Sequence, residues 1–584
     1  MRKIAGILSI LLLIGFSGNA RGEQAGTSFP SSGVSDPAPS QGTSVTGDTL
    51  TMEVPYSQES FDQSKANEAI LAGPPASPRV VPFHHGPPPI ERPGGAALPA
   101  LPPSAQEPLA PAPLAPALSN GFQGLIDTNT FIPPDTMGAA GPSHLMSTLN
   151  TGVGIFNKTT GNKISEVTLQ AFWAALGTGA GQPANDPFDP KIIYDQYAGR
   201  FIVVTLGGGP SPNSWLMIAV SATSDPNGTW YKWAIDADKD NNQQLYNNWA
   251  DYPGLGIDAF NVYITGNMFD STGTYQYSKV WVIPKPQLIS GASTITWTEF
   301  RNPPGSYFVM QPAHTFGSAA AEYFIFEEGY TTEYYLLVAK IDNVSGTPVW
   351  HSPISVGVAS YSTSYSLPGA PQAGDSRTIS TNDTRLMNAV YRNGSLWTTH
   401  NVAVSGKVEV AWYQVNPVAG TTTSQGRIKD PSRWYYFPSI AVNTTGDAAI
   451  GFTGSSTTEY AGAFYTGRSF IDPPGAMQPV ATLKAGLAPY FKDYGSGRNR
   501  WGDYSATCVD PNDDRTFWTL QEYANTPANN WATWWGSFKF HRSSAIDFEG
   551  DGKTDPAIYR PSNGYWVILQ SSNNYDRSNY KAHQ

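Results

Sequence analysis

RWGDYSATCVDPNDDRTFWTLQEY, residues 500–523, is the clearest copy of a pattern that recurs along the chain. Residues 504–509 alternate and favour a β-strand, and residues 516–520 form a second β-prone run containing Phe517 and Trp518. Between them, the residues DPNDD at 510–514 favour a turn, because proline fixes φ and Asn and Asp side chains cap their own backbone. The segment therefore predicts a strand, a turn and a second strand.

The same pattern returns elsewhere in the chain. The copies are PKIIYDQYAGRFIVVTL from Pro190, PGLGIDAFNVYITGN from Pro253, LMNAVYRNGSLWTTH from Leu386, PSIAVNTTGDAAIGF from Pro438 and, more weakly, PSHLMSTLNTGVGIF from Pro142 and SAAAEYFIFEE from Ser318. Their spacing is roughly 50–70 residues, near the ~40–50 residues of one propeller blade. We predict an all-β chain with a β-propeller of seven blades, within a range of six to eight. A β-sandwich is the alternative, but so many evenly spaced hairpins fit poorly into two sheets.

The overall composition limits the classes of partner that the chain can bind. The 584 residues carry a net charge of −11, only 14% are charged and 12% are aromatic. An acidic chain without a Lys/Arg run has no electrostatic footprint for nucleic acid, so we expect no nucleic-acid partner. The single cysteine, Cys508, excludes an intramolecular disulfide and lies in an apolar strand, where a buried, inert thiol is expected. We expect a monomer.

The ends of the chain differ from its middle. Residues 1–20 have the charged start, apolar run and small-x-small site of a signal peptide, which predicts a secreted or cell-surface protein with no transmembrane segment. Residues 21–120 include dense Pro/Ala runs and are predicted to be a disordered spacer or propeptide. We assign residues 121–542 to the propeller, with its last blade completed by strands from both ends of the repeat region, and residues 543–584 to a separate small module.

Several segments resemble those of secreted bacterial β-propeller proteins of a sialidase-like type. They are PPDTMGAAGPSHLMSTLN, FDPKIIYDQYAGRF, SATSDPNGTWYKW, DTRLMNAVYRNGSLW and RWGDYSATCVDPNDDRTFW. The C-terminal segment DFEGDGKTD at 547–555, with the residues PAIYRPSNGYWVIL after it, is similar to a single FG-GAP (VCBS-type) repeat. These resemblances imply a propeller followed by a calcium-loop repeat.

The loop at 547–555 predicts one Ca²⁺ site. Calcium takes six to eight oxygen ligands, and side chains at alternate positions of a tight loop can point to one centre. Clustered carboxylates repel one another unless a cation is present. The predicted ligands are Asp547, Glu549, Asp551 and Asp555 through their side chains, and Lys553 through its carbonyl. A solvated Asp/Gly turn is the alternative.

A second candidate site is a ring of acidic residues, each near the start of a predicted first strand. If the hairpins are blades, these residues and their neighbours approach the mouth of the central channel at one level. The predicted ligand-binding residues are Asp135, Asp189, Trp249, Asp251, Asp383, Arg385, Arg433, Arg500, Trp501 and Asp503. Acids, arginines and tryptophans together suit a carbohydrate or a cation. The alternative is that each Asp binds backbone amides in a turn.

These patterns favour a binding protein for a carbohydrate or an extracellular protein. A sialidase-like glycoside hydrolase is the runner-up, with Asp135 as acid and three arginines from among Arg385, Arg433, Arg468 and Arg500 for a carboxylate. Against it, Phe131-Ile132-Pro133 has Phe where that resemblance implies Arg, and no Tyr/Glu pair can be assigned, so the catalytic residues stay unassigned. A structural module of a larger secreted assembly is the third alternative.

Overall fold

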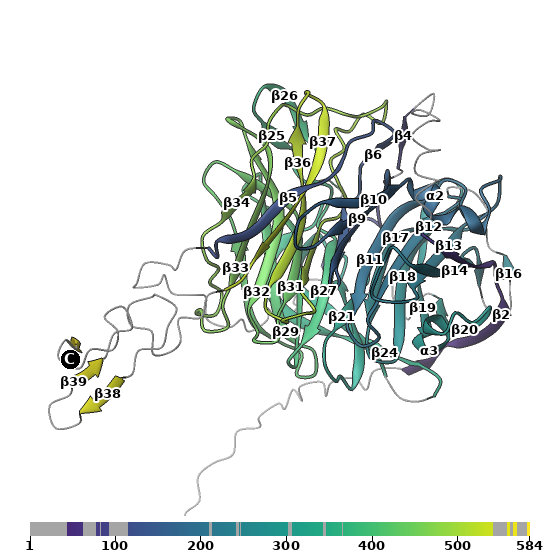
Figure 1. The fold of residues 1–584 in the computed structure, drawn as a ribbon, viewed down its shortest axis with the longest axis horizontal. Helices are drawn as coiled ribbons and strands as arrows, with labels where there is room; N and C mark the ends of the chain where they lie inside the picture. The colour runs from purple at the N-terminus through teal and green to yellow at the C-terminus, as the bar shows by residue number, and fades with distance from the viewer. Residues whose placement is uncertain are drawn as a thin grey trace, which may run out of the picture. The chain divides into compact units, whose positions relative to one another are not determined.

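Antiparallel strands in sets of four account for most of the structure (Figure 1). The computed structural model describes residues 44–61, 78–81, 83–92, 115–209, 213–240, 244–245, 247–301, 307–342, 346–364, 366–540, 557–560, 565–568 and 581–583. All of these lie in one compact unit, Thr43–Gln584. In the part of the chain so described, no helix has the length and apolar character needed to cross a membrane.

Six sets follow one another directly along the sequence. They are β7 (Met137–Ala140), β8 (His144–Leu149), β9 (Gly152–Asn157) and β10 (Lys163–Val167); β11 (Phe188–Asp195), β12 (Arg200–Gly207), β13 (Trp215–Ser221) and β14 (Thr229–Asp236); β17 (Trp249–Ile257), β18 (Asn261–Phe269), β19 (Tyr275–Pro284) and β20 (Thr294–Arg301); β21 (Gln311–Thr315), β22 (Ala321–Glu327), β23 (Thr332–Asp342) and β24 (Val349–Ser362); β27 (Leu386–Arg392), β28 (Ser395–Val404), β29 (Lys407–Asn416) and β30 (Thr421–Ile428); and β31 (Trp434–Val442), β32 (Ala448–Ser456), β33 (Glu459–Arg468) and β34 (Ala481–Lys484). Within each set, neighbouring strands pair antiparallel in chain order.

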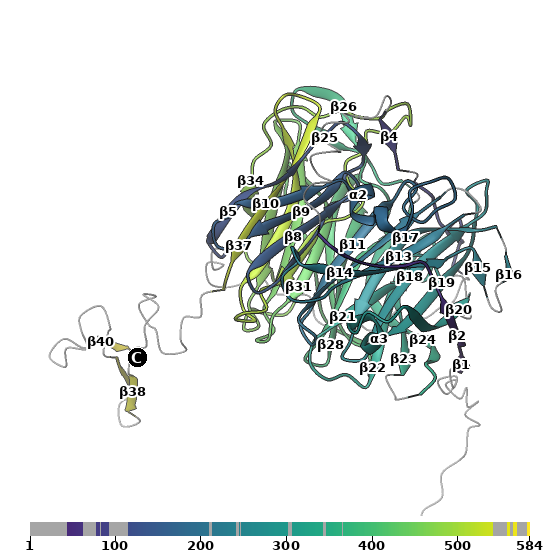
Figure 2. The same ribbon diagram turned by 45° about the vertical axis from the view of Figure 1, so that its right-hand side comes forward.

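The seventh set is built from both ends of the repeat region. It contains β35 (Ala506–Val509), β36 (Phe517–Asn525) and β37 (Asn530–Phe538), and its fourth strand is β5 (Leu118–Ile126). The β5 strand pairs antiparallel with β37, and the two lie side by side in both views (Figures 1 and 2). This pairing confirms the predicted closure, which covers an edge that β37 would otherwise expose.

The first strands of the sets form a closed ring. β7 contacts β11, β11 contacts β17, and the series continues through β21, β27, β31 and β35 back to β7. Short parallel pairings join Ile257 to His314 and residues 313–315 to residues 389–391. First strands that meet around one axis define a β-propeller and exclude the two-layer sandwich.

The expectation that residues 21–120 form a disordered spacer is wrong for the described residues of that range. β1 (Ser44–Thr46), β2 (Asp48–Glu53) and β3 (Tyr56–Ser60) pair antiparallel with the outer strands β24, β20 and β14 (Figure 2). The Pro/Ala composition that suggested disorder belongs to residues 98–116, whereas residues 44–61 contain one proline, no alanine and three threonines. An outer strand presents unpaired N–H and C=O groups, which such a β-prone segment can satisfy.

Smaller elements complete the fold. They are β4 (Arg79–Val80), β6 (Phe131–Ile132), α2 (Leu169–Trp173), the 3₁₀ turn η1 (Ala174–Leu176), β15 (Lys239–Asp240), β16 (Gln244–Leu245), α3 (Lys285–Ile289), β25 (Ala370–Gln372) and β26 (Asp375–Ile379). Near the C-terminus, β38 (Ala557–Arg560), β39 (Tyr565–Ile568) and β40 (Lys581–His583) form a three-stranded antiparallel sheet. The hydrophobic core consists of clusters between neighbouring sets, and Trp173, Trp233, Trp350 and Trp535 are fully buried in them.

Candidate functional site

The structure brings most of the predicted ring together at the end of the axis where the first strands begin. Its members Asp135, Asp189, Asp251, Asp383, Arg385, Arg500 and Asp503 are all buried. We call these seven residues the mouth cluster. They meet because the first strands line the axis, so residues near the start of each strand reach the same level.

Asp503 is the centre of the hydrogen-bond network in the mouth cluster. Its backbone N–H donates to Asp135 Oδ1 at 3.0 Å, and its Oδ2 accepts from an Arg500 guanidinium nitrogen at 2.8 Å. The Asn382 amide also donates to its side chain. In the same cluster, Arg385 binds both oxygens of Asp383 at 2.7 Å each. The acids and arginines of the mouth thus fix one another in place.

Asp135 and Asp189 lie side by side under this network. Burial, then the charges of Asp503 and Asp189, raises the pKa of Asp135 well above its ordinary value. Burial, followed by the charges of Asp251 and Asp503, raises the pKa of Asp189 to about 7. The Tyr504 hydroxyl donates to Asp189 Oδ2 at 2.8 Å. These carboxyl groups therefore hold protons more readily than free aspartates.

Lys191 is a cation in the same region that the sequence patterns did not single out. Its Nζ lies 3.1 Å from the centroid of the Tyr504 ring and 5.3 Å from that of Tyr252. Burial lowers its pKa to about 7, although Asp189 and Asp135 oppose that shift. It is the second residue of PKIIYD, two positions after Asp189, where strand alternation turns its side chain toward the axis. That alternation was the signal available in the sequence.

A second residue missed from sequence is Arg498, which joins Arg385 and Arg500 around one phenylalanine. The guanidinium carbons of Arg498, Arg385 and Arg500 lie 4.0, 4.5 and 5.4 Å from the centroid of the Phe83 ring. Burial, then the neighbouring Arg500, lowers the pKa of Arg498 to about 10. We call Arg385, Arg498 and Arg500 the arginine cluster. Three like charges at one position favour an electron-rich or anionic partner there.

Trp249, another predicted ligand-binding residue, reaches the mouth indirectly. Its ring packs edge-on against His84, with centroids 4.7 Å apart. On the other side, His84 Nδ1 lies 3.5 Å from Asp251 Oδ2. Trp249 itself is fully buried, and its indole N–H donates to the Asp270 carbonyl at 3.0 Å. It therefore supports the mouth and does not face it.

The structure places two predicted ring residues elsewhere. Arg433 has a 31% exposed side chain and binds Glu459, with a contact of 2.7 Å, outside the mouth cluster. Trp501 is buried in the core, where its indole N–H donates to Thr453 at 3.1 Å and its ring packs on Tyr490. Arg433 and Trp501 were predicted because they lie next to a strand start or to Asp503 in the sequence. That proximity does not determine the direction in which a side chain points.

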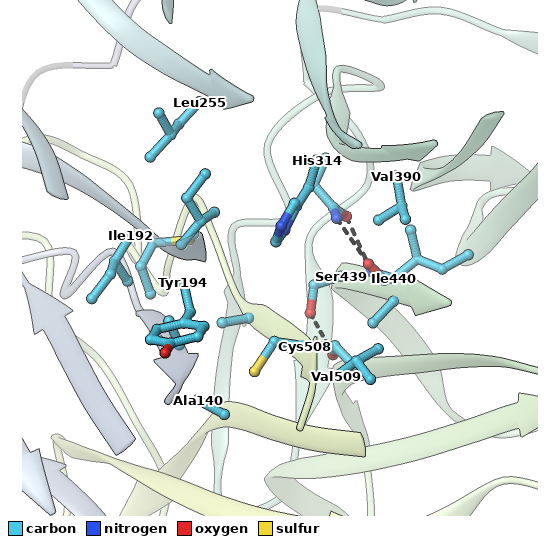
Figure 3. Close-up of a pocket in the computed structure, with 18 of the residues that line it drawn as sticks. Ala140, Ile192, Tyr194, Leu255, His314, Val390, Ser439, Ile440, Cys508 and Val509 are labelled. Carbon is cyan, nitrogen blue, oxygen red and sulfur yellow. Dashed lines mark hydrogen bonds between the residues drawn. The ribbon is translucent and has the colours of Figure 1, made fainter. Parts of the chain in front are cut away.

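A cavity of about 180 Å³ lies along the axis, lined by residues of the first strands. Figure 3 shows apolar side chains such as Ile192, Leu255 and Val390 around it. Burial lowers the pKa of His314 to about 3 and raises that of the Cys508 thiol to about 12. Neither side chain is therefore an ionised nucleophile or a charged ligand group at neutral pH.

The predicted calcium ligands Asp547, Glu549, Asp551, Lys553 and Asp555 lie outside the described residues. Among the residues that are described, no group of three or more His, Cys, Asp or Glu side chains is arranged to hold a metal ion. The mouth cluster is consistent with that result, since its acids are engaged by arginines, amides and hydroxyl groups.

Comparison with known proteins gives structural likeness only. No family model matches the chain, and no curated protein matches it. Among solved structures, it is similar to the Hadza microbial sialidase Hz136 (11% identity, 68% of this chain and 73% of that chain, TM-score 0.31). It is also similar to a Trypanosoma rangeli sialidase in complex with sialic acid (10% identity, 68% of this chain and 59% of that chain, TM-score 0.32). A third similar structure is the Dos1 propeller (9% identity, 72% of this chain and 94% of that chain, TM-score 0.30). At these scores, the β-propeller is established by the chain's own strand pairings.

Proposed function

We propose that the protein is an exported, seven-bladed β-propeller that binds a carboxylate-bearing carbohydrate at the channel mouth. The blade count rests on the ring of seven first strands. The single observation that carries the ligand class is the convergence of Arg385, Arg498 and Arg500 on one ring position. Guanidinium groups bind carboxylates through paired, charge-assisted hydrogen bonds, and a buried setting strengthens them.

Binding is favoured over hydrolysis by the state of the tyrosines. A sialidase-like hydrolase would need an ionised or readily ionised nucleophile beside the arginine cluster. Burial raises the pKa of Tyr252 and of Tyr504 well above the ordinary tyrosine value. Tyr504 also donates a hydrogen bond to Asp189, so its hydroxyl keeps its proton and acts as a donor. Neither tyrosine is an activated nucleophile in this arrangement.

The hydrolase remains the second candidate because of one specific observation. The pKa of Asp189, raised by burial to about 7, leaves a carboxyl group that can carry a proton near neutral pH, as a general acid must, and the pKa of the neighbouring Asp135 is raised as well. That property sits within the same mouth cluster as the arginines. Release of product from a chromogenic sialoside or glucuronide, abolished by Asp135→Asn, would support this alternative.

We also propose that residues 1–20 direct export and that residues 547–555 bind one Ca²⁺, on the sequence evidence given above. Extracellular modules often bind calcium with Kd values on the order of 10⁻⁴–10⁻³ M. Calorimetric titration of calcium into chelator-treated protein should give a binding heat that Asp551→Ala removes. Equal heats for the native protein and the variant would reduce the loop to a turn.

The mouth proposal is tested by calorimetric titration with trigalacturonate, with neutral maltotriose and tetra-aspartate as comparison ligands. Arg498→Ala should weaken trigalacturonate binding roughly 10- to 100-fold, because a hydrogen bond to a charged group contributes about 1.5–3 kcal/mol. The matched control is Arg433→Ala, which removes an arginine outside the mouth cluster and should leave the affinity unchanged.

Three results would contradict this assignment. Equal loss in the two arginine variants would show that general charge attraction dominates. Equal affinity for maltotriose would show that the carboxylates are not recognised. Tighter binding of tetra-aspartate would replace the carbohydrate with an acidic peptide.

A further inference from the structure

An N-terminal segment crosses the channel mouth above the arginine cluster. It comprises the described residues of 78–92, and we call it the strap. Its first part, β4, pairs in parallel with β6, and the Val81 N–H donates to the Ile132 carbonyl at 2.8 Å. Arg79 also forms an ion pair with Asp186. This end of the strap is held beside the entry to β7.

The other end of the strap is held at the turn between β22 and β23. The Ile90 N–H donates to the Gly329 carbonyl at 3.1 Å, and the Thr331 N–H donates to the Ile90 carbonyl at 3.0 Å. Arg92 pairs with Glu328 and Glu333, and its guanidinium carbon lies 4.1 Å from the centroid of the Tyr330 ring. One anchor thus lies beside the entry to β7 and the other at the turn between β22 and β23, which belong to different sets of the ring, so the strap spans the mouth.

Between the anchors, the strap occupies the arginine cluster much as a ligand would. Arg500 donates to the Val81 carbonyl at 3.0 Å, and Arg385 donates to the His84 carbonyl at 3.2 Å. The Phe83 ring lies among the three guanidinium groups. Two main-chain oxygens and one π-face therefore take the positions that the oxygens of an anionic ligand would need.

The middle of the strap is held by side-chain contacts, whereas the backbone pairings described above lie at its ends. Residues 86–89 read GPPP, and prolines have no N–H with which to extend a pairing. The middle can therefore lift from the arginine cluster while both anchors stay paired. A glycine before three prolines provides the change of direction such a movement needs.

We propose that the strap masks the mouth site in cis, so that an anionic ligand binds only by displacing the Phe83 ring and the His84 carbonyl oxygen, while the anchored Val81 stays in place. This inference rests on the proposed function for the identity of the ligand. Because the ligand binds only molecules in which the strap is lifted, the apparent affinity is the intrinsic affinity multiplied by the fraction of such molecules. Weakening the middle of the strap must then raise the affinity without adding any contact to the ligand.

The test uses the full chain and the variant Phe83→Ala, with Phe83→Leu as a second variant that keeps apolar bulk. The matched control is Glu91→Ala, which changes an exposed strap residue. The first readout needs no ligand: phenylglyoxal modification of Arg498, followed by mass spectrometry, should be at least about tenfold faster in both Phe83 variants and unchanged in the control. The second readout is trigalacturonate affinity, which should rise by a similar factor and be lost again in Phe83→Ala/Arg498→Ala.

The possible results test masking by the strap and the identity of the ligand separately. Equal modification rates of Arg498 in the native protein and both Phe83 variants would overturn the masking. Faster modification with unchanged trigalacturonate affinity would overturn the competition. Faster modification with no binding of trigalacturonate by any variant would support the masking and overturn the proposed ligand.

Discussion

At the scale of the residue, the Cys508 thiol shows how burial sets chemistry in this protein. It faces the axial cavity and has a pKa of about 12, because burial disfavours the thiolate. At pH 8, the thiolate fraction is then on the order of a thousandfold below that of an ordinary cysteine. We predict that iodoacetamide alkylates native Cys508 about a thousandfold more slowly than the same residue in guanidinium.

Mass spectrometry at timed intervals measures both rates. A native rate within tenfold of the unfolded rate would show that Cys508 is an accessible, ionisable thiol and would reopen the cavity as a site of covalent chemistry. The expectation of an inert thiol came from the apolar strand around it, and the raised pKa supports it.

Side chains near the starts of the first strands could be located from sequence, but their partners could not. Asp135, Asp189 and Asp503 meet because the strand order fixes their level on the axis. Arg498 lies in the loop GSGRNR, and its guanidinium packs on the ring of Phe83, a residue more than 400 positions away. No local pattern encodes a contact between residues so far apart in the sequence. The sequence patterns therefore identified Arg385 and Arg500 but not Arg498.

At the scale of the element, β5 is the strand on which ring closure depends. Its neighbouring residues Leu125 and Ile126 point to opposite faces, with exposures of 2% and 46%. We predict that Leu125→Ala lowers the free energy of unfolding by about 2–5 kcal/mol, the usual range for a buried leucine. The matched variant Ile126→Ala should change it by less than about 0.5 kcal/mol.

Chemical denaturation of both variants measures the difference. Equal small changes would mean that β5 contributes no buried side chain to the core of the ring. Its pairing with β37 would then add little to the free energy of unfolding. Equal large changes would mean that Ile126 is buried in solution by a contact outside this structure.

The repeated hairpins predicted most of the element pattern, because strand alternation and turn residues are local signals. The pairing of β1, β2 and β3 with the outer strands could not be predicted in the same way. Those strands gain their stability from edges contributed by residues 169 to 307 positions later. A composition average over residues 21–120 also concealed two different kinds of segment, one β-prone and one rich in proline.

At the scale of the whole molecule, the net charge of −11 gives no hint of the arginine cluster. Net charge describes the average field, whereas the mouth brings Arg385, Arg498 and Arg500 to one position through the ring of first strands. The three guanidinium groups thus meet at the Phe83 ring although the chain as a whole is acidic. The strap now fills that place.

The most direct test of this account is a crystal structure of the Phe83→Ala protein grown with trigalacturonate. The account predicts a ligand carboxylate within hydrogen-bond distance of Arg385, Arg498 and Arg500, with residues 83–86 moved off the mouth and both strap anchors still paired. Trigalacturonate bound elsewhere, or a strap unmoved beside an occupied mouth, would contradict it.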